Sequence, residues 1–223
     1  DRQLRDIVVG VSKSSRFAKY RTGFDITAAS EVMAALGLAG SIHDFKNKLA
    51  KISVALTKSG ELVTAKDLKA SGAMALLLKD TLKPNLVQTL EGQPVFMHTG
   101  PFANVSHGNS SLISTTLALK LANYVVTESG FGTDLGLEKM FDIVCREGNL
   151  KPSAVVLVVS IKALKSHAGE AMGSRKLSEA LREGFENMDR HLENIRKFGL
   201  PVVVAINRFP QDTPDEIKAV RDY

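Results

Sequence analysis

Short apolar runs rich in β-branched residues recur along the chain and predict strands. They occupy residues 7–11, 52–57, 95–97, 124–127, 154–159 and 202–206. Runs of this length without polar alternation are typical of strands that are buried on both faces of a parallel sheet.

Between these runs, apolar residues recur at helical spacing and predict amphipathic helices. The residues on each predicted face are Ile26, Ala29, Val32, Met33 and Leu36; Leu112, Thr116, Leu119 and Leu121; and Leu181, Phe185, Met188, Leu192 and Ile195. A further helix is predicted to begin after Thr213, because Pro214 follows this capping residue and Glu216 stands three positions after it. Alternating strands and helices predict an α/β fold with a mostly parallel sheet and helices on both faces, in the doubly wound manner of P-loop NTPases.

The length and composition favour one domain. A chain of 223 residues with 44% hydrophobic content can bury one substantial core, so we expect a single α/β domain over residues 1–223. Residues 43–72 are more polar and contain a turn at 58–61, which predicts a hairpin-like excursion. The first residue is Asp, and the helix after Thr213 meets the last residue soon after it begins, so we expect this chain to be part of a longer polypeptide.

Charge and cysteine content narrow the possible partners. A net charge of +5 and a pI of 9.3 favour anionic ligands. The densest basic group, Lys46, Lys48 and Lys51, has no interleaved aromatic residues, so we expect a solvated helix face and no nucleic-acid partner. No apolar run is long enough to span a membrane, and no signal peptide or metal-ligand spacing is recognisable. The single cysteine, Cys145, is interpreted as a core thiol in a protein of a reducing compartment.

Three polar loops interrupt the apolar runs, at residues 83–91, 98–110 and 127–136, and the second and third contain glycines. His98, Glu128 and Asn207 each stand at the carboxyl end of a predicted strand. Since the carboxyl ends of parallel strands share one edge of the sheet, we expect these loops to converge on a ligand site. The loops' glycines would permit positive φ or a close approach of backbone amides to an anion, with Ser110 or Asp134 capping the helices that follow.

The loops also carry a resemblance to a known family. The strings FDITAASEVMA (24–34), KPNLVQTLE (83–91), GPFAN (100–104) and VVTESGFG (125–132) closely resemble formate–tetrahydrofolate ligase, and the similarity runs through nearly the whole chain. The resemblance implies an ATP-dependent ligation of formate to tetrahydrofolate through formyl phosphate, with Mg²⁺ accompanying ATP and a monovalent cation as a further possibility. It also implies a cytoplasmic or, in a eukaryote, mitochondrial location and a homo-oligomeric parent.

The resemblance implies roles for particular side chains. Lys83 would clamp the phosphate or the intermediate, and His98 and His107 would bind formyl phosphate or assist proton transfer. Phe131, exposed by its flanking glycines, would stack on the pterin ring. Further substrate-binding positions are Glu128, Asp134, Asn104, Gln88, Glu91, Gly100, Gly130 and Gly132, and weaker nucleotide-binding candidates are Lys165, Asn207 and Asp212.

Structural alternatives stand beside these roles. Lys83 could be an ordinary solvated lysine, either histidine could tie down its loop by bonding a backbone carbonyl, and Asp134 could cap the next helix.

The chain also departs from the family pattern. The phosphate-binding loop of the GxxxxGK[ST] type is absent, since no glycine is followed by lysine, and so is the aromatic C-terminal region. Thr99 and Ala168 stand where the family usually has glycine, and Ser106 where it has alanine. We therefore expect the central part of a ligase that is inactive alone. The alternatives are a folate-binding module without ATP chemistry, and a structural portion whose site other segments complete.

Overall fold

The computed structural model describes residues 5–10, 19–23, 26, 29–167 and 177–223. The chain divides into two compact units. The first comprises residues 1–131 and 138–150, and the second comprises residues 132–137 and 151–223. The single α/β domain expected from the sequence stays a prediction.

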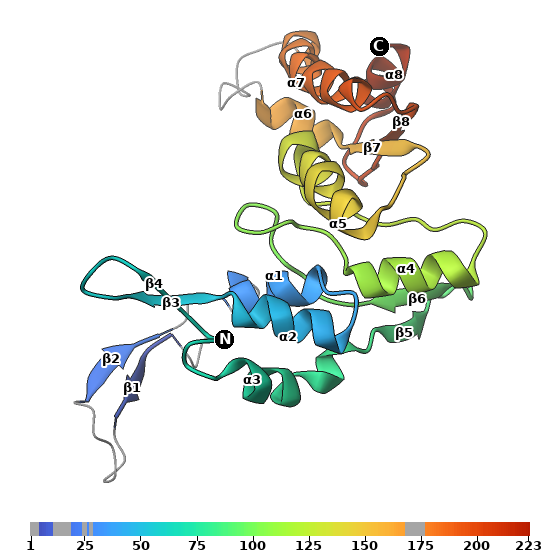
Figure 1. Ribbon diagram of the computed structural model, residues 1–223. Coiled ribbons are helices and arrows are strands. Elements are labelled where there is room, and N and C mark those ends of the chain that lie inside the picture. The colour runs from blue at the N-terminus through green and yellow to red at the C-terminus, as the bar shows by residue number, and fades with distance from the viewer. Residues whose placement is uncertain (1–4, 11–18, 24–25, 27–28, 168–176) are drawn as a thin grey trace. The chain divides into compact units, whose positions relative to one another are not determined.

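The first half of the first unit consists of hairpins and short helices (Figure 1). Its elements are β1 (Ile7–Val9), β2 (Tyr20–Thr22), α1 (Glu31–Gly37), α2 (Ile42–Ala50), β3 (Ser53–Leu56), β4 (Leu62–Thr64) and α3 (Ser71–Leu77). A core of Leu36, Ala39, Phe45, Leu49 and Ala75 holds the three helices together. The β3–β4 hairpin lies within the polar stretch 43–72, and its turn is closed by a hydrogen bond from Thr57 N to Glu61 O.

The second half of this unit contains most of the predicted polar loops. Its elements are the 3₁₀ helix η3 (Lys79–Leu82), β5 (Asn85–Gln88), β6 (Pro94–Met97), α4 (Leu112–Leu121), the π-helix η5 (Met140–Cys145) and α5 (Arg146–Gly148). Helix α4 lies alongside β6 (Figure 1). Leu112 packs with Met140, Val144 and Cys145 in a second apolar cluster, which confirms Cys145 as a buried core thiol. Burial raises the pKa of that thiol.

The second unit is built around one parallel strand pair. Its elements are the π-helix η4 (Thr133–Leu137), β7 (Val155–Val159), α6 (Ile161–His167), α7 (Leu177–Lys197), β8 (Val202–Ile206) and α8 (Pro214–Asp222). Leu181, Phe185 and Met188 of α7 pack against α6 and α8, as the apolar periodicity predicts. Thr213 caps α8 in a capping box with Glu216, which confirms the predicted helix start.

The prediction of a mostly parallel sheet is not matched by the strand pairings of the described residues. They form four two-stranded sheets, of which β7–β8 is parallel and the other three are antiparallel. In the β3–β4 and β5–β6 pairs a strand returns through a tight turn, and a connection this short can join only antiparallel strands. The sequence analysis predicted no strand at β2 and assigned β5 to a polar loop, whereas β4 follows the turn expected at 58–61.

Individual strand predictions differ from the structure in burial and in extent. The run 7–11 gives β1, which ends at Val9, and Val11 lies outside the described residues. All of β3 is exposed, although residues 52–57 were predicted to be buried. Residues 124–127 form no strand, since their one nearby pairing is an isolated bridge between Asn109 and Ser129. Apolar β-branched runs therefore identified extended backbone more reliably than burial.

Two predicted helices also need correction. Helix α1 begins only at Glu31, because Ser30 caps it through its side chain, and Ile26 lies outside the helix and is exposed. On α4 the buried face contains Leu112, Ser114 and Thr115, whereas Leu119 and Leu121 are exposed. Hydroxyl groups tolerate this burial because both donate to the carbonyl oxygen of Ser111. The cap of α4 is Ser111, and not Ser110 as predicted.

Candidate functional site

The second and third polar loops contact each other within the first unit. The segment between β6 and α4 meets the segment that follows α4 at Gly108 and Asn109. Gly130 N donates to Gly108 O at 2.9 Å, and the Ser129 hydroxyl donates to Asn109 Oδ1 at 2.6 Å. These bonds bring residues 98–110 and 127–130 together without a parallel sheet.

The first polar loop adjoins the second through the β5–β6 hairpin and through His98. Asn85 pairs with Met97 in the hairpin, so the start of the first loop lies beside the residue that precedes His98. His98 Nε2 lies 2.6 Å from the carbonyl oxygen of Thr81, two positions before Lys83. The first unit therefore contains the first two loops and residues 127–131 of the third in one connected region.

His98 is held at both ring nitrogens. Because a carbonyl oxygen only accepts, Nε2–H donates to Thr81 O, and Nδ1 faces the Ser111 hydroxyl at 2.6 Å. Ser111 Oγ also lies 2.9 Å from Ser114 Oγ and accepts from Ser114 N. The half-buried imidazole is thus oriented by the 3₁₀ helix η3 on one side and by the first turn of α4 on the other.

His107 is buried with one ring nitrogen unsatisfied among the described residues. Its side chain is 2% exposed, and Nδ1 lies 3.3 Å from Ser106 Oγ. Nε2 and the nearby Thr99 Oγ1 are buried without a hydrogen-bond partner in the described part of the chain. A Cβ placed on Gly37 would lie 2.7 Å from His107 Nε2 and 3.7 Å from Thr99 Oγ1, so this glycine lets α1 approach the ring.

Burial keeps the His107 ring neutral near neutral pH. Desolvation, reinforced by the positive charge of Lys139, lowers the pKa of His107 to about 4. A neutral imidazole carries one donor and one acceptor, so it can take up or release a proton only when a partner reaches Nε2.

Lys83 is an exposed cation on the polar loop that precedes β5. Its ammonium forms an ion pair with Asp80 at 2.8 Å, and both side chains are more than two-thirds exposed, at 77% and 71%. The Asp80 carboxylate raises the pKa of Lys83, so the ammonium stays charged. Downstream, Gln88 donates to Gly92 O at 3.1 Å and Glu91 is exposed at the hairpin turn.

The remaining predicted substrate positions in the first unit are exposed, except for Gly130, which is half-buried. Phe131 is 90% exposed, as its flanking glycines suggested, and Glu128, Asn104 and Gly100 are exposed as well. A Cβ on Gly130 would lie 2.2 Å from Ala103 Cβ, so Gly130 has a packing reason to be glycine.

In the second unit, Gly132 and Asp134 belong to the start of η4. Gly132 has φ +70°, and its α-carbon is close to the Asp134 carboxylate. Asp134 is exposed and lies in the first turn of the helix. Thr133 between them is buried and is bonded to α7, because its hydroxyl lies 2.8 Å from His191 Nδ1 and accepts from Asn194 Nδ2.

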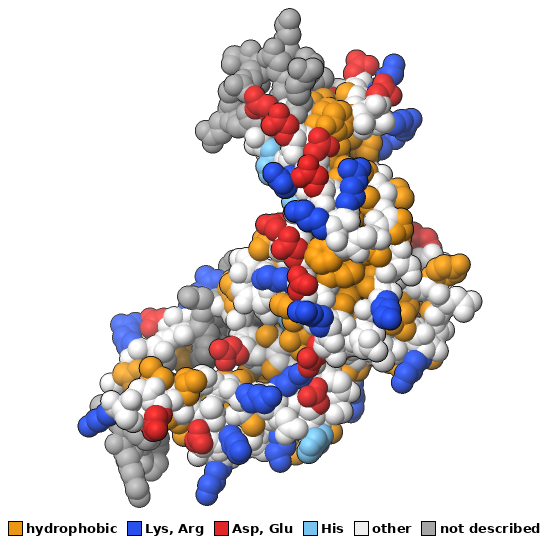
Figure 2. All heavy atoms as spheres, turned by 45° about the horizontal axis from the view of Figure 1, so that its top comes forward, with side chains coloured by type: hydrophobic (Ala, Val, Ile, Leu, Met, Phe, Trp, Pro, Cys, Tyr) orange, Lys and Arg blue, Asp and Glu red, His pale blue; other side chains and the backbone are white. Residues whose placement is uncertain are grey.

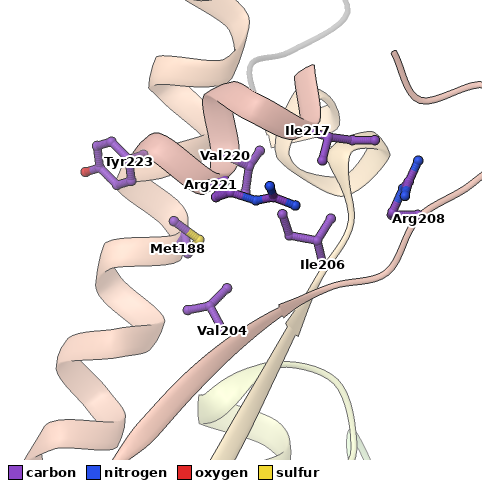
Figure 3. Close-up of a pocket in the computed structure, with 8 residues that line it drawn as sticks. All are labelled: Met188, Val204, Ile206, Arg208, Ile217, Val220, Arg221 and Tyr223. Atoms are coloured by element: carbon purple, nitrogen blue, oxygen red, sulfur yellow. The ribbon is translucent and has the colours of Figure 1, made fainter. Parts of the chain in front are cut away.

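The three nucleotide-binding candidates have structural partners within the second unit. Lys165 forms an ion pair with the buried Glu216, Asn207 N donates to Val159 O, and Asp212 accepts from Phe209 N at 2.7 Å. A hollow of about 480 Å³ lies between α7, β8 and α8 (Figure 3). Arg208 and Arg221 project beside its apolar wall, and it contains none of the predicted site residues. Ala168 lies outside the described residues.

Neither surface charge nor metal-ligand side chains of the described residues define the candidate site further. Basic and acidic side chains lie interspersed over the face shown in Figure 2. Among the described residues, no group of three or more His, Cys, Asp or Glu side chains is arranged to hold a metal ion. Within the same part of the chain, no helix is long and apolar enough to cross a membrane.

Sequence reasoning missed Ser111, Asn109 and Lys139, which organise the connected loops. Ser111 and Asn109 stand in a polar string directly before an apolar helix, which is the signal of a capping segment. Lys139 gives no such signal, because its role depends on which distant carbonyl groups its side chain reaches.

Comparison with known proteins agrees with the resemblance seen in the sequence. The model of the family described as formate–tetrahydrofolate ligase matches residues 1–223. A curated formate–tetrahydrofolate ligase of Sinorhizobium fredii (strain NBRC 101917 / NGR234) is 52% identical over 226 residues, which cover 100% of this chain and 40% of the relative. The chain thus spans well under half the length of that relative. Because the family match covers its whole length, the chain belongs to the formate–tetrahydrofolate ligase family.

Proposed function

We propose that the longer protein ligates formate to tetrahydrofolate at the expense of ATP, giving 10-formyltetrahydrofolate, ADP and phosphate. The observation that carries this proposal is the family match over all 223 residues, together with the relative of the same name at 52% identity. The meeting of the first two polar loops with the start of the third in the first unit supports a site there.

The chemistry proceeds in two steps. A formate oxygen attacks the γ-phosphorus of ATP, the bond to the β,γ-bridging oxygen breaks, and ADP leaves as formyl phosphate forms. The folate amine then attacks the formyl carbon, phosphate departs, and the amine loses a proton. Negative charge gathers first on the transferring phosphoryl group and then on the carbonyl oxygen, so both steps benefit from fixed cations and hydrogen-bond donors.

Lys83 is our candidate for the phosphate clamp. Its ammonium is charged and exposed, and among the described residues it pairs with the similarly exposed Asp80. An exposed ion pair of this kind contributes little to stability, so a phosphoryl group can replace the carboxylate at small cost.

The two histidines have different candidate roles. His98 has both ring nitrogens engaged, which suits a residue that fixes the loop or relays a proton through Ser111. In the described part of the chain His107 Nε2 has no hydrogen-bond partner, which suits a group that completes its hydrogen bonding only when the loop rearranges around a ligand.

The folate would bind where the loops expose their polar and aromatic groups. Phe131 offers an open ring face on which the pterin can stack. In the first unit, polar contacts would come from the other proposed substrate positions, which are Glu128, Asn104, Gln88, Glu91, Gly100 and Gly130. Asp134 and Gly132 are proposed substrate positions of the second unit.

The nucleotide part of the site needs groups that this chain lacks. The phosphate-binding loop of the family is absent here, so Lys165, Asn207 and Asp212 would make at most peripheral contacts with ATP and its Mg²⁺. We infer that the chain alone does not turn over. A doubly wound fold, a monovalent cation, a homo-oligomeric parent and a cytoplasmic location complete the proposal.

The test compares two substitutions in the full-length protein, assayed with ATP, formate and tetrahydrofolate. Lys83→Ala should lower kcat more than it changes the affinity for tetrahydrofolate, and Phe131→Ala should weaken that affinity more than it lowers kcat. Equal effects of both substitutions on both parameters would contradict the assigned roles.

A correctly folded full-length protein that forms no 10-formyltetrahydrofolate would overturn the function. Calorimetry that finds folate binding without ATP binding would instead support a folate-binding module.

A further inference from the structure

Lys139 holds the turn that carries two of the proposed site residues. It precedes η5, and its half-buried ammonium donates to Ser106 O at 2.6 Å and also to Ala103 O. The same turn is closed internally by a hydrogen bond from Ser106 N to Phe102 O at 2.7 Å. The Lys139 ammonium therefore satisfies two carbonyl oxygens of this turn. One belongs to Ala103, directly before Asn104, and the other to Ser106, directly before His107.

The environment of His107 gives this ammonium a second role. The ring is bounded by Gly37 of α1, by Thr99 after β6 and by Ser106 in its own loop, all of which are uncharged. Among the described residues, the charge that acts on the ring is that of Lys139. A fixed positive charge near a buried imidazole disfavours its protonation.

We propose that Lys139 is a positioning residue of the formyl-transfer site, which fixes the Ala103–His107 turn and places a positive charge near the buried His107 ring. This inference rests on the function proposed above. Lys139 acts through the loop and touches no substrate in this assignment. A neutral His107 is the form that can accept the proton released when the folate amine is formylated. Lys139 would therefore influence both the position of this ring and its ability to accept that proton.

The experiment compares Lys139→Met with Lys139→Arg in the full-length protein. The methionine variant loses both hydrogen bonds and the charge, so kcat should fall by about tenfold to a hundredfold through misplacement of the loop. The acidic limb of its pH–rate profile should move to higher pH. The arginine variant retains charge and donors, and its pH profile should stay close to that of the unchanged protein. Lys58→Met, at the exposed turn of the β3–β4 hairpin, is the matched control and should leave both readouts unchanged.

NMR titration of His107 in this same chain provides a readout that does not depend on ligase activity. The midpoint should lie near 4 in the unchanged chain and rise in Lys139→Met, while burial still holds it below the ordinary value of 6.5. If the methionine variant does not fold, the arginine variant decides, and a midpoint raised above that of the unchanged chain would overturn the proposal. A folded Lys139→Met with unchanged kcat and unchanged His107 titration would also overturn it. Absence of ligase activity in the full-length protein would contradict the proposed function. An unchanged His107 midpoint in Lys139→Met would instead contradict the role of Lys139.

Discussion

The backbone N–H of Gly130 donates to the carbonyl oxygen of Gly108, and both glycines pack against Ala103. A Cβ on Gly130 would lie 2.2 Å from the Ala103 methyl group, and a Cβ on Gly108 would lie 2.3 Å from it. Ala103 thus leaves no room for a side chain at position 108 or 130, and this close packing brings the two polar segments together.

Gly130→Ala should destabilise the first unit by about 1–3 kcal/mol, because the new methyl group overlaps that of Ala103. The double variant Gly130→Ala with Ala103→Gly should recover most of this loss, since the next contact of the new Cβ is at 3.5 Å. Urea unfolding of the single and double variants measures the coupling free energy. Purely additive effects would show that the overlap is not the cause.

Gly108→Ala provides the contrasting case. Its Cβ would also lie 2.5 Å from Ala103 Cα, and Gly108 has φ +65°. Removing the Ala103 methyl group leaves the backbone overlap and the left-handed conformation in place. We therefore expect Ala103→Gly to leave Gly108→Ala destabilised in the same urea experiment, and recovery comparable to that of Gly130→Ala would contradict this geometry.

The sequence predicted the α7 face, the α8 cap and the β7–β8 strands because each depends on local chemistry. Leu181, Phe185 and Met188 repeat at helical spacing, and Thr213 and Glu216 form a cap within four residues. The pairing of β5 with β6 was missed because it depends on a turn at Gly92, which the sequence does not distinguish from other polar turns.

The sequence predicted that the polar loops would meet, but the structural reason differs from the expected one. The loops were expected to meet at the edge of a parallel sheet, yet they meet through hydrogen bonds of His98 and Gly130. Polar composition indicated which loops would meet, because a buried polar group such as Asn109 needs a partner, which Ser129 provides. Sequence spacing could not reveal which partner each group would find.

Thr99→Gly should stabilise the chain by about 1 kcal/mol. Thr99 has φ +57°, a left-handed conformation that costs a residue with a Cβ about 1–2 kcal/mol, and its buried hydroxyl has no partner in the described part of the chain. The greater backbone freedom of glycine offsets about 0.5–1 kcal/mol of that gain. The midpoint of thermal unfolding measures the change. Asn149→Gly, at φ +49°, is the control and should change the midpoint less, because asparagine tolerates this conformation; a lower midpoint for Thr99→Gly would contradict the strain argument.

Neutral His98 should carry its proton on Nε2. Thr81 O can only accept, so Nε2–H donates to it, and Nδ1 is left as the unprotonated nitrogen that faces the Ser111 hydroxyl at 2.6 Å. Nitrogen-15 chemical shifts of the ring distinguish the two tautomers. Ser111→Ala should change the Nδ1 shift, whereas Ser110→Ala, whose hydroxyl faces the His98 carbonyl group at 3.4 Å, should leave it unchanged. A spectrum with the proton on Nδ1 would exclude this arrangement.

Glu216 should make the stability of α8 depend on pH in the acidic range. Burial raises the pKa of this carboxyl group, but hydrogen bonds from Lys165 and Thr213 outweigh burial and hold the pKa below its ordinary value of 4.5. The ionised group therefore stabilises the fold above about pH 4.5, and this contribution is lost as the pH falls through the lowered value.

The substitution Glu216→Gln separates this contribution from other acidic groups. At pH 7 it should cost about 1–3 kcal/mol, because the Lys165 ammonium loses its carboxylate partner. The stability difference between the unchanged chain and this variant should narrow as the pH falls below 4.5, as followed by urea unfolding between neutral and acidic pH. Glu193→Gln, which removes an exposed pair with Arg190, should show little difference at any pH. A Glu216→Gln difference that stays constant with pH would mean that the carboxyl group has the same pKa in the folded and unfolded chains.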